Sequence, residues 1–145
     1  MKNSVIINKK IKPYNKTIKN IAGDKSISIR FLILASLAYG KSIAHNLSDA
    51  EDIVNTLKCI RKFGIKIKFK NKFCEVYGNG LYGYEYKKNI NLDAGNSGTA
   101  ARLLSAILVN SPKYIKITGD NSLKKRDMRR IVDPLKEFGA IFKIK

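Results

Sequence analysis

Two glycine-rich segments of the sequence carry the cations and hydroxyls that could bind an anionic ligand. Residues 23–30 read GDKSISIR, and residues 95–102 read GNSGTAAR. Each segment begins with glycine, places an arginine seven positions later and runs into an apolar stretch. The first amides of a helix lack partners within it, and the helix dipole adds positive charge there, so such a loop favours an anion. The repeated pattern therefore predicts anion sites at two helix starts.

The charged residues of these segments each have a structural alternative. Lys25 and Arg30 would be ordinary surface cations if no ligand were present, but a helix start is electrostatically unfavourable for a cation, so the glycine loop favours ligand contact. For Arg102, bonding inside the loop and contact with a ligand both stay open. His45, the only histidine, lies in a predicted strand, and we expect a packing or surface role for it and not that of a base.

Composition limits the class of protein. A chain of 145 residues with 44% apolar content can bury one core, which predicts one domain or a large piece of one. No apolar run is long enough to span a bilayer, and residues 1–10 do not resemble a secretion signal, so we expect a cytoplasmic protein. Cys59 and Cys74 are too few and too far apart for a zinc site, and both are expected to be reduced.

The net charge of +18 raises the possibility of nucleic-acid binding. However, lysines alternate with apolar residues over 65–70 and recur over 142–145, as on the solvent face of a strand. The only dense basic cluster is 124–130, and no aromatic side chains that could stack on bases lie within it. Most of the charge is therefore expected to be solvated surface, with a minority that attracts a small anion.

The elements that must position these residues form a partly repeated α/β (α+β) pattern. We predict helices over 27–39, from about 48 to 63, over 100–109 and over 129–138, and strands over 42–46, 65–70, 73–77, 89–92, 115–118 and 140–145. Gly40 is expected to stop the first helix, and Ser48 with Glu51 to form a capping box that also explains the neighbouring Asp49 and Asp52. Pro134 should kink the last helix or mark its true beginning.

The order of elements is a βαβαββ unit followed by most of a second copy. In each unit one helix is apolar on most sides, which implies that the units pack around shared central helices. The second copy lacks its last strand. We therefore expect part of a larger architecture.

Three motifs, at residues 23–30, 94–100 (AGNSGTA) and 119–128 (GDNSLKKRDM), closely resemble the 5-enolpyruvylshikimate-3-phosphate synthase family in order and spacing. The resemblance covers the chain from about residue 22 to its end. It implies an enolpyruvyl transferase inside-out α/β barrel, with two lobes of three βαβαββ units each, helices inside and sheets outside. This chain would be a partial lobe, with residues 22–80 as the first unit and 89–145 as most of the second. Residues 1–21 would be opening strands that belong to the other lobe.

The resemblance also implies an activity, 3-phosphoshikimate 1-carboxyvinyltransferase of the shikimate pathway for aromatic amino acids. The enzyme transfers enolpyruvyl from phosphoenolpyruvate to the 5-hydroxyl of shikimate 3-phosphate and releases phosphate, without a metal or organic cofactor. By motif, Lys25 would be catalytic and contact both substrates. The shikimate 3-phosphate ligands would be Lys25, Ser26 and Arg30, and the phosphoenolpyruvate ligands Lys25, Gly98 and Arg126, with Asn96 and Thr99 shaping the loop.

Two positions depart from the family pattern. Ile29 stands where the family usually has histidine or asparagine, and Asp127 replaces a proline and is expected to weaken Arg126 by pairing with it. The other lobe, which the family needs to complete its cleft, would have to come from the remainder of the enzyme, so the 145-residue chain alone is expected to lack turnover. Two alternatives stay open: a UDP-sugar enolpyruvyl transferase, against which residues 24–26 argue, and a non-enzymatic basic module that binds nucleic acid.

Overall fold

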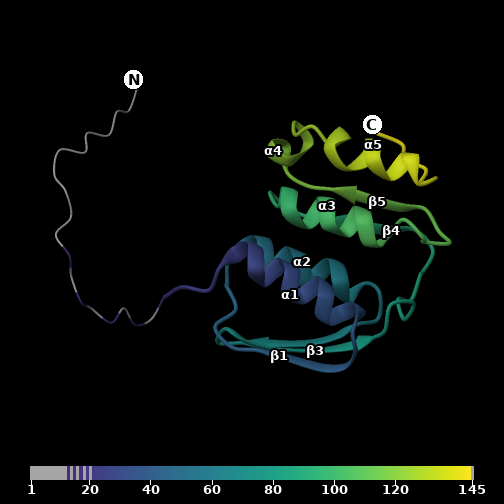
Figure 1. The fold of residues 1–145 in the computed structure, drawn as a ribbon. Coiled ribbons are helices and arrows are strands. Elements are labelled where there is room, and N and C mark those ends of the chain that lie inside the picture. Colours follow the sequence, from purple (N-terminus) through teal and green to yellow (C-terminus); the bar gives the residue numbers. More distant parts are fainter. Residues whose placement is uncertain (1–12, 14, 16, 18, 20, 145) are drawn as a thin grey trace, which may run out of the picture.

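The computed structural model describes residues 13, 15, 17, 19 and 21–144. Its elements form four layers: a sheet, a pair of helices, a helix beside a second sheet, and two further helices (Figure 1). The opening strands predicted within residues 1–21 lie almost entirely outside the described residues. The elements are α1 (Lys25–Leu37), β1 (Tyr39–Ala44), α2 (Glu51–Arg61), β2 (Lys66–Lys70), β3 (Phe73–Asn79), β4 (Ile90–Asp93), α3 (Gly98–Ile107), β5 (Ile115–Thr118), α4 (Asn121–Lys124) and α5 (Arg129–Glu137).

The first unit is an antiparallel sheet of order β1-β3-β2 with α1 and α2 on one face. In β2 and β3, alternate residues are buried because successive side chains of a strand point to opposite faces. The three lysines of β2 therefore lie on the solvent face, as the alternating sequence predicts. On the inner side, the Phe63 ring stacks on Tyr84 with centroids 4.8 Å apart.

The first helix begins and ends two residues earlier than predicted. It begins at Lys25 because the Asp24 carboxylate accepts the Ile27 amide hydrogen at 2.6 Å, which fixes Asp24 as the N-cap. It ends at Leu37, and the chain is extended from Ala38 onward. Gly40, predicted to stop this helix, lies instead inside β1 with a φ of 92°. The prediction was wrong because an extended residue, and not a left-handed glycine, follows the helix.

The capping box predicted for Ser48 and Glu51 is also wrong. Helix α2 begins at Glu51, its N-cap is Ala50, and no side chain caps it. The Ser48 hydroxyl accepts instead from the Ala50 amide at 3.3 Å, and the Ser48 amide donates to the Ser28 hydroxyl at 3.0 Å. Ser48 is thus used to fasten the start of α2 to the first turn of α1.

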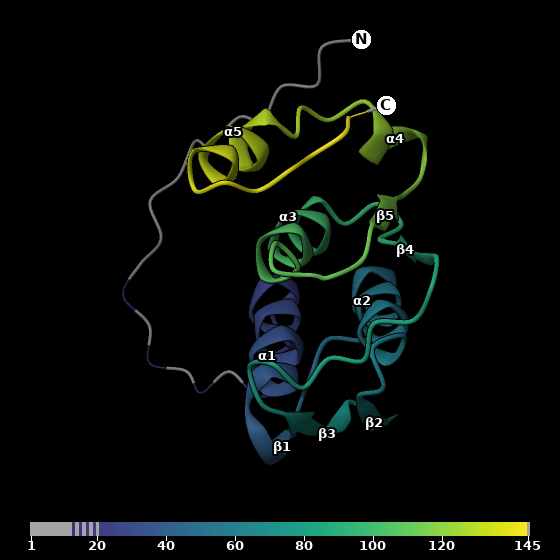
Figure 2. The same ribbon diagram turned by 90° about the vertical axis from the view of Figure 1, so that its right-hand side faces the viewer.

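The second unit contains a parallel pair, β4 and β5, beside α3. Figure 2 shows α3 over α1 and the strand pair over α2, so the two units share a helical interior, as predicted. The short helix α4 lies in a segment predicted as loop, and Asp120 caps it. Pro134 lies inside α5, which begins at Arg129, so it does not mark the start of that helix.

The final strand predicted over 140–145 is absent from its described residues, 140–144. A strand needs a neighbour to bond with, and none of the described strands pairs with this segment. The Ile141 side chain is accordingly 88% exposed.

The first helix is less enclosed than its composition predicts. Ile29 and Leu32 are fully buried, but Ile27 and Leu34 are 69% and 67% exposed and lie seven positions apart, hence on one face. One apolar face of α1 is therefore open in this chain. None of the helices that the structure describes has the length and apolarity needed to cross a membrane.

Candidate active site

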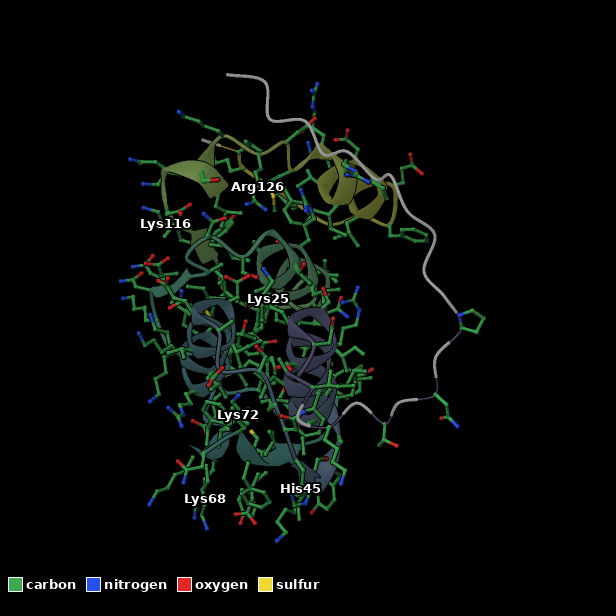
Figure 3. The ribbon with its side chains drawn as sticks, turned by 90° about the vertical axis from the view of Figure 1, so that its left-hand side faces the viewer. Lys25, His45, Lys68, Lys72, Lys116 and Arg126 are labelled. Atoms are coloured by element: carbon green, nitrogen blue, oxygen red, sulfur yellow. The ribbon has the colours of Figure 1, made fainter. Side chains whose placement is uncertain are left out.

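Helices α1, α2 and α3 all begin on one side of the molecule, which faces the viewer in Figure 3. The predicted residues Lys25 and Arg126 both lie on this side, with Lys25 between α1 and α2 and Arg126 beyond the start of α3 (Figure 3). His45 follows β1 and lies at the foot of the view in Figure 3, where its ring packs on Phe73 with centroids 5.1 Å apart. The prediction of a packing or surface role for His45 is confirmed.

Lys25 forms an ion pair that the sequence analysis did not predict. Its Nζ lies 2.9 Å from Oδ2 of Asp52, and the two side chains are 56% and 16% exposed. Asp52 lies in the first turn of α2, where the helix dipole stabilises a carboxylate. Sequence analysis assigned Asp52 to capping alone. The pair instead joins the starts of two helices and compensates the unfavourable position of the Lys25 charge.

The other residues predicted to bind shikimate 3-phosphate lie on the first two turns of α1. Arg30 is exposed, and its Nη1 donates to the Ser26 carbonyl oxygen at 3.0 Å, so the guanidinium folds back toward the helix start. Ile29, the first departure from the family pattern, is fully buried in the core. Ile29 therefore contributes to the core and does not lie on the exposed face that carries Arg30.

Gly23 has a packing role that the sequence analysis did not predict. A Cβ at this position would overlap the Asn46 carbonyl oxygen and lie 2.8 Å from the Ser48 nitrogen. Two backbone segments thus approach each other here, and Asn46 Nδ2 also donates to the Ile21 carbonyl oxygen at 2.9 Å. Glycine at 23 is therefore required by chain packing, and the predicted close approach of a ligand stays a prediction.

The second loop is held in place from both ends. Ser97 caps α3 by accepting the Ala100 amide at 3.2 Å, and Asp93 accepts the Gly95 amide at 2.9 Å. The Gly95 carbonyl in turn accepts the Asp120 amide at 3.0 Å, which fastens this loop to the one that carries Arg126. The motifs at 94–100 and 119–128, distant in sequence, are therefore neighbours in space.

Arg126 lies over the start of α3. Its Nη2 donates to Oδ1 of Asn96 at 2.5 Å, and its Nη1 is 2.9 Å from the point that a Cβ on Gly98 would occupy. Asn96 is oriented by its own donation to Asp120 at 2.8 Å. The pKa of Asp120 is lowered mainly by the Leu123 amide and also by Asn96, so this carboxylate stays ionised and fixed. The structure thus brings together Asn96, Gly98 and Arg126, as predicted.

Asp127 does not pair with Arg126, and that expectation was wrong. Its carboxylate binds Arg129 instead, with Arg129 Nη2 3.0 Å from Oδ2 and Nε 3.1 Å from Oδ1. The side-chain hydrogen bond from Arg129 is the main cause of the lowered pKa of Asp127. The second departure from the family pattern therefore leaves the Arg126 guanidinium available to an anion.

The cations of the candidate site, Lys25, Arg30 and Arg126, are exposed. Cavities of about 460 Å³, beside Asp49 and Lys72, and about 400 Å³, beside Lys58 and Arg61, lie elsewhere and include none of the predicted site residues. A single wall of a cleft would have this appearance. No group of histidine, cysteine and acidic side chains that could hold a metal ion occurs in the described part of the chain.

The comparisons with known proteins identify the family. A model of EPSP synthase (3-phosphoshikimate 1-carboxyvinyltransferase) matches residues 8–145. The chain belongs to the EPSP synthase family. It is 43% identical over 129 residues to the 3-phosphoshikimate 1-carboxyvinyltransferase of Bacillus cytotoxicus, covering 89% of this chain and 30% of that protein. The Syntrophomonas wolfei enzyme is 41% identical over 134 residues, covering 92% and 31%.

Solved structures agree with this assignment. The EPSP synthase from Acinetobacter baumannii superposes with a TM-score of 0.78 and 37% identity, over 83% of this chain and 28% of that one. The family fold expected from the motifs, an inside-out α/β architecture present here as a partial lobe, is thereby confirmed. The chain spans about 30% of the length of the EPSP synthases that it matches.

Proposed function

We propose that this chain supplies one wall of the active site of a 3-phosphoshikimate 1-carboxyvinyltransferase, and that its substrates are shikimate 3-phosphate and phosphoenolpyruvate. The observation that carries the proposal is the placement of Arg126 over Gly98 at the start of α3, oriented by Asn96. None of the ion pairs found among the described residues involves Arg126. A helix start with a fixed guanidinium is suited to a phosphate or carboxylate group.

Each loop is assigned one substrate. Gly98, through its backbone amide, and Arg126 bind phosphoenolpyruvate, because the first amides of α3 and the guanidinium fork present several donors to one anionic group. Ser26 and Arg30 bind the carboxylate of shikimate 3-phosphate from the first turns of α1. Lys25 lies beside α2, and its ammonium contacts both substrates.

Lys25 is proposed to be the catalytic residue of this wall. In the reaction, the 5-hydroxyl oxygen of shikimate 3-phosphate bonds to C2 of phosphoenolpyruvate while C3 gains a proton. The tetrahedral intermediate then loses phosphate from C2 and a proton from C3, which restores the double bond. The Lys25 ammonium stabilises the negative charge that the phosphate carries as the C–O bond breaks. Its ion pair with Asp52 holds the ammonium in place before the reaction.

The rest of the active site is proposed to come from the remainder of the enzyme. We assign residues 22–80 to the first βαβαββ unit, 89–145 to most of the second, and 1–21 to strands of the other lobe. The chain alone should have no turnover, and the complete enzyme should be cytoplasmic. The names of the relatives give no support to a UDP-sugar acceptor or to nucleic-acid binding.

The binding test uses the ¹⁵N-labelled 145-residue chain. Titration with shikimate 3-phosphate should shift the backbone amides of residues 25–30, and phosphoenolpyruvate those of residues 97–99, both with weak affinity. A UDP-sugar titrated in parallel should shift neither set. Shifts confined to residues 124–130 for both ligands would contradict the proposed sites, since they would indicate unspecific attraction to the basic cluster.

The activity test uses fragment complementation. This chain is mixed with the part of the Bacillus cytotoxicus enzyme that it does not match, and phosphate release is measured with both substrates. Turnover should appear in the mixture and be absent from either fragment. It should be lost with Lys25→Met and kept with Lys113→Met, an exposed lysine outside the site. Turnover by this chain alone, or equal turnover with Lys25→Met, would overturn the assignment.

A further inference from the structure

Arg102 has an unexplained feature in this structure. Among the side chains that the structure describes, its Nε is the buried nitrogen or oxygen atom without a hydrogen-bond partner. An unpaired buried donor is costly, and on a charged group more so, and such atoms in native proteins are uncommon enough to need a reason. The proposed function uses Gly98 and Arg126 from this region but gives Arg102 no role.

The position of Arg102 suggests what that role is. It lies four residues after Gly98 in α3, hence on the same face of the helix. Its Nη1 is 3.1 Å from the point that a Cβ on Gly98 would occupy, and Arg126 Nη1 is 2.9 Å from the same point. The two guanidinium groups therefore both lie beside Gly98 and close to each other.

The nearby carboxylates offset this pair only in part. The pKa of Asp127 is lowered mainly by the Arg129 side chain and least by the charge of Arg102, and the pKa of Asp120 is lowered mainly by the Leu123 amide and least by the charge of Arg126. Asp127 is bound to Arg129, and Asp120 accepts from the Leu123 amide and from Asn96. Two like charges at this separation repel, and the repulsion is strongest where water is partly excluded. An anion that binds beside Gly98 would relieve it.

Arg102 also makes a contact that acts on Arg126. Its Nη2 donates to the Asp127 carbonyl oxygen at 3.4 Å, next in sequence to Arg126. The bond connects rigid α3 to the loop that carries Arg126. A neutral donor such as glutamine would serve for fastening alone, without the cost of placing a second cation beside the first.

We propose that Arg102 is a positioning residue of the anion site: from α3 it fixes the Asp127 backbone, holds the Arg126 guanidinium over Gly98, and adds a second positive charge that favours the phosphoryl group of phosphoenolpyruvate. The inference rests on the proposed phosphoenolpyruvate site. It assigns a function to the second of the two arginines with which the glycine-rich segments end.

The binding experiment measures the affinity of the 145-residue chain for inorganic phosphate and for phosphoenolpyruvate by ³¹P NMR at low salt. Arg102→Gln should weaken both by about tenfold, the size of one charge-assisted contact. Arg102→Lys keeps the charge but loses the planar guanidinium group. Its affinities should lie between those of the unmodified chain and of Arg102→Gln. Arg130→Gln is the matched control, because it removes the same charge from an exposed position on α5. A loss with Arg102→Gln no larger than that with Arg130→Gln would overturn the proposal.

A double-mutant cycle tests whether Arg102 acts through Arg126. If it positions Arg126, Arg102→Gln should cost much less in the Arg126→Gln background than in the unmodified chain. Additive losses would show two independent ligands and contradict the positioning role. Urea unfolding of each variant confirms that it is folded, and Arg102→Lys replaces Arg102→Gln in the cycle if the latter is not.

A readout without substrate separates this inference from the proposed function. The Nε–H signal of Arg126 in a ¹⁵N spectrum should move in Arg102→Gln even with no ligand present, because the guanidinium is no longer held over Gly98. It should be unchanged in Arg130→Gln. If the unmodified chain binds neither phosphoenolpyruvate nor shikimate 3-phosphate, the proposed function fails, but the Arg126 signal still tests the positioning role of Arg102. A signal that does not move in Arg102→Gln would overturn that role.

Discussion

The ammonium of Lys25 lies 2.9 Å from the carboxylate of Asp52, and this pair joins the first turns of α1 and α2. A cation at a helix start is electrostatically strained, and a carboxylate at another helix start is favoured. The pair therefore places a positive charge where the backbone alone would not keep one. It also means that an incoming anion competes with Asp52 for the lysine.

Replacing Asp52 with asparagine should separate these two effects. Because Lys25 is more than half exposed, the free energy of unfolding should fall by less than about 1 kcal/mol. Phosphate affinity at low salt should rise several-fold, since the competing carboxylate is gone. Urea unfolding and ³¹P titration measure the two. Asp49→Asn is the control, because Asp49 is exposed and pairs only loosely with Lys72 at 3.7 Å. Equal affinities in the two variants would show that Asp52 does not act on Lys25.

Replacing Gly98 with alanine should reduce anion binding without unfolding the protein. The new methyl group would meet the flexible ends of Arg126 and Arg102, which can move aside, so stability should change by less than about 1 kcal/mol. The displaced guanidinium groups should weaken phosphoenolpyruvate binding about tenfold or more.

Gly119→Ala is the contrasting variant. Its methyl group would overlap the Gly95 carbonyl oxygen, which is backbone and cannot yield cheaply, so it should cost about 2 kcal/mol or more. Unfolding curves of both variants check this order. A Gly98→Ala protein less stable than Gly119→Ala would contradict the geometry.

The two buried thiols should make stability depend on alkaline pH. Burial raises the pKa of Cys59 and of Cys74 from 9.0 to about 11. The folded state therefore holds the thiol protons more tightly than the unfolded state, and unfolding releases them above pH 9. The free energy of unfolding should fall as pH rises from about 9 to about 11. Between about pH 7 and 8.5 the two thiols should cause no change in it.

Urea unfolding at pH 8, 9.5 and 10.5, with a reductant present, measures the slope. The Cys59→Ala/Cys74→Ala variant should show a smaller loss over the same range, with the remainder due to tyrosines such as Tyr84, whose pKa burial raises to about 12. Identical slopes in the two proteins would exclude the thiols as the cause.

The open face of α1 should be needed for assembly and not for the folding of this chain. Leu34 is mostly exposed, so Leu34→Glu should change the stability of the 145-residue chain by less than about 0.5 kcal/mol. In the mixture with the unmatched part of the Bacillus cytotoxicus enzyme, it should abolish phosphate release, because a charge cannot be buried against the added helices. Lys58→Glu, on the exposed side of α2, is the control and should leave complementation intact.

The sequence predicted the element order and most helices and strands, because the apolar periods are regular and the turns carry glycine or asparagine. It failed where a local signal had a tertiary use. Ser48 resembles a cap but bonds to Ser28, and Gly40 resembles a helix stop but lies in β1. Residues 140–144 have the strand pattern and no partner to form a sheet. These three structures depend on which segments of the chain come into contact. The pattern of a single segment does not specify its tertiary contacts.

For the site, motif resemblance selected residues that the structure places on one side of the molecule. Gly98 and Arg126 are neighbours, as predicted, through Asn96. The ion pairs could not be predicted from the sequence. Lys25 pairs with Asp52, and Asp127 pairs with Arg129 instead of Arg126. Acidic residues are close to several cations in this sequence, and only the fold decides which pairs form.

Strands β4 and β5 form a parallel pair of four residues each, with no third strand beside them in the described chain. The three-stranded sheet of the first unit has more hydrogen-bonded length and a helix layer directly on it. Amide protons of β4 and β5 should accordingly exchange with deuterium well before those of β3, as small sheets open locally. On heating, local unfolding should therefore begin in the second unit. The thermal stability of the whole chain would then be limited by the two-stranded sheet of β4 and β5.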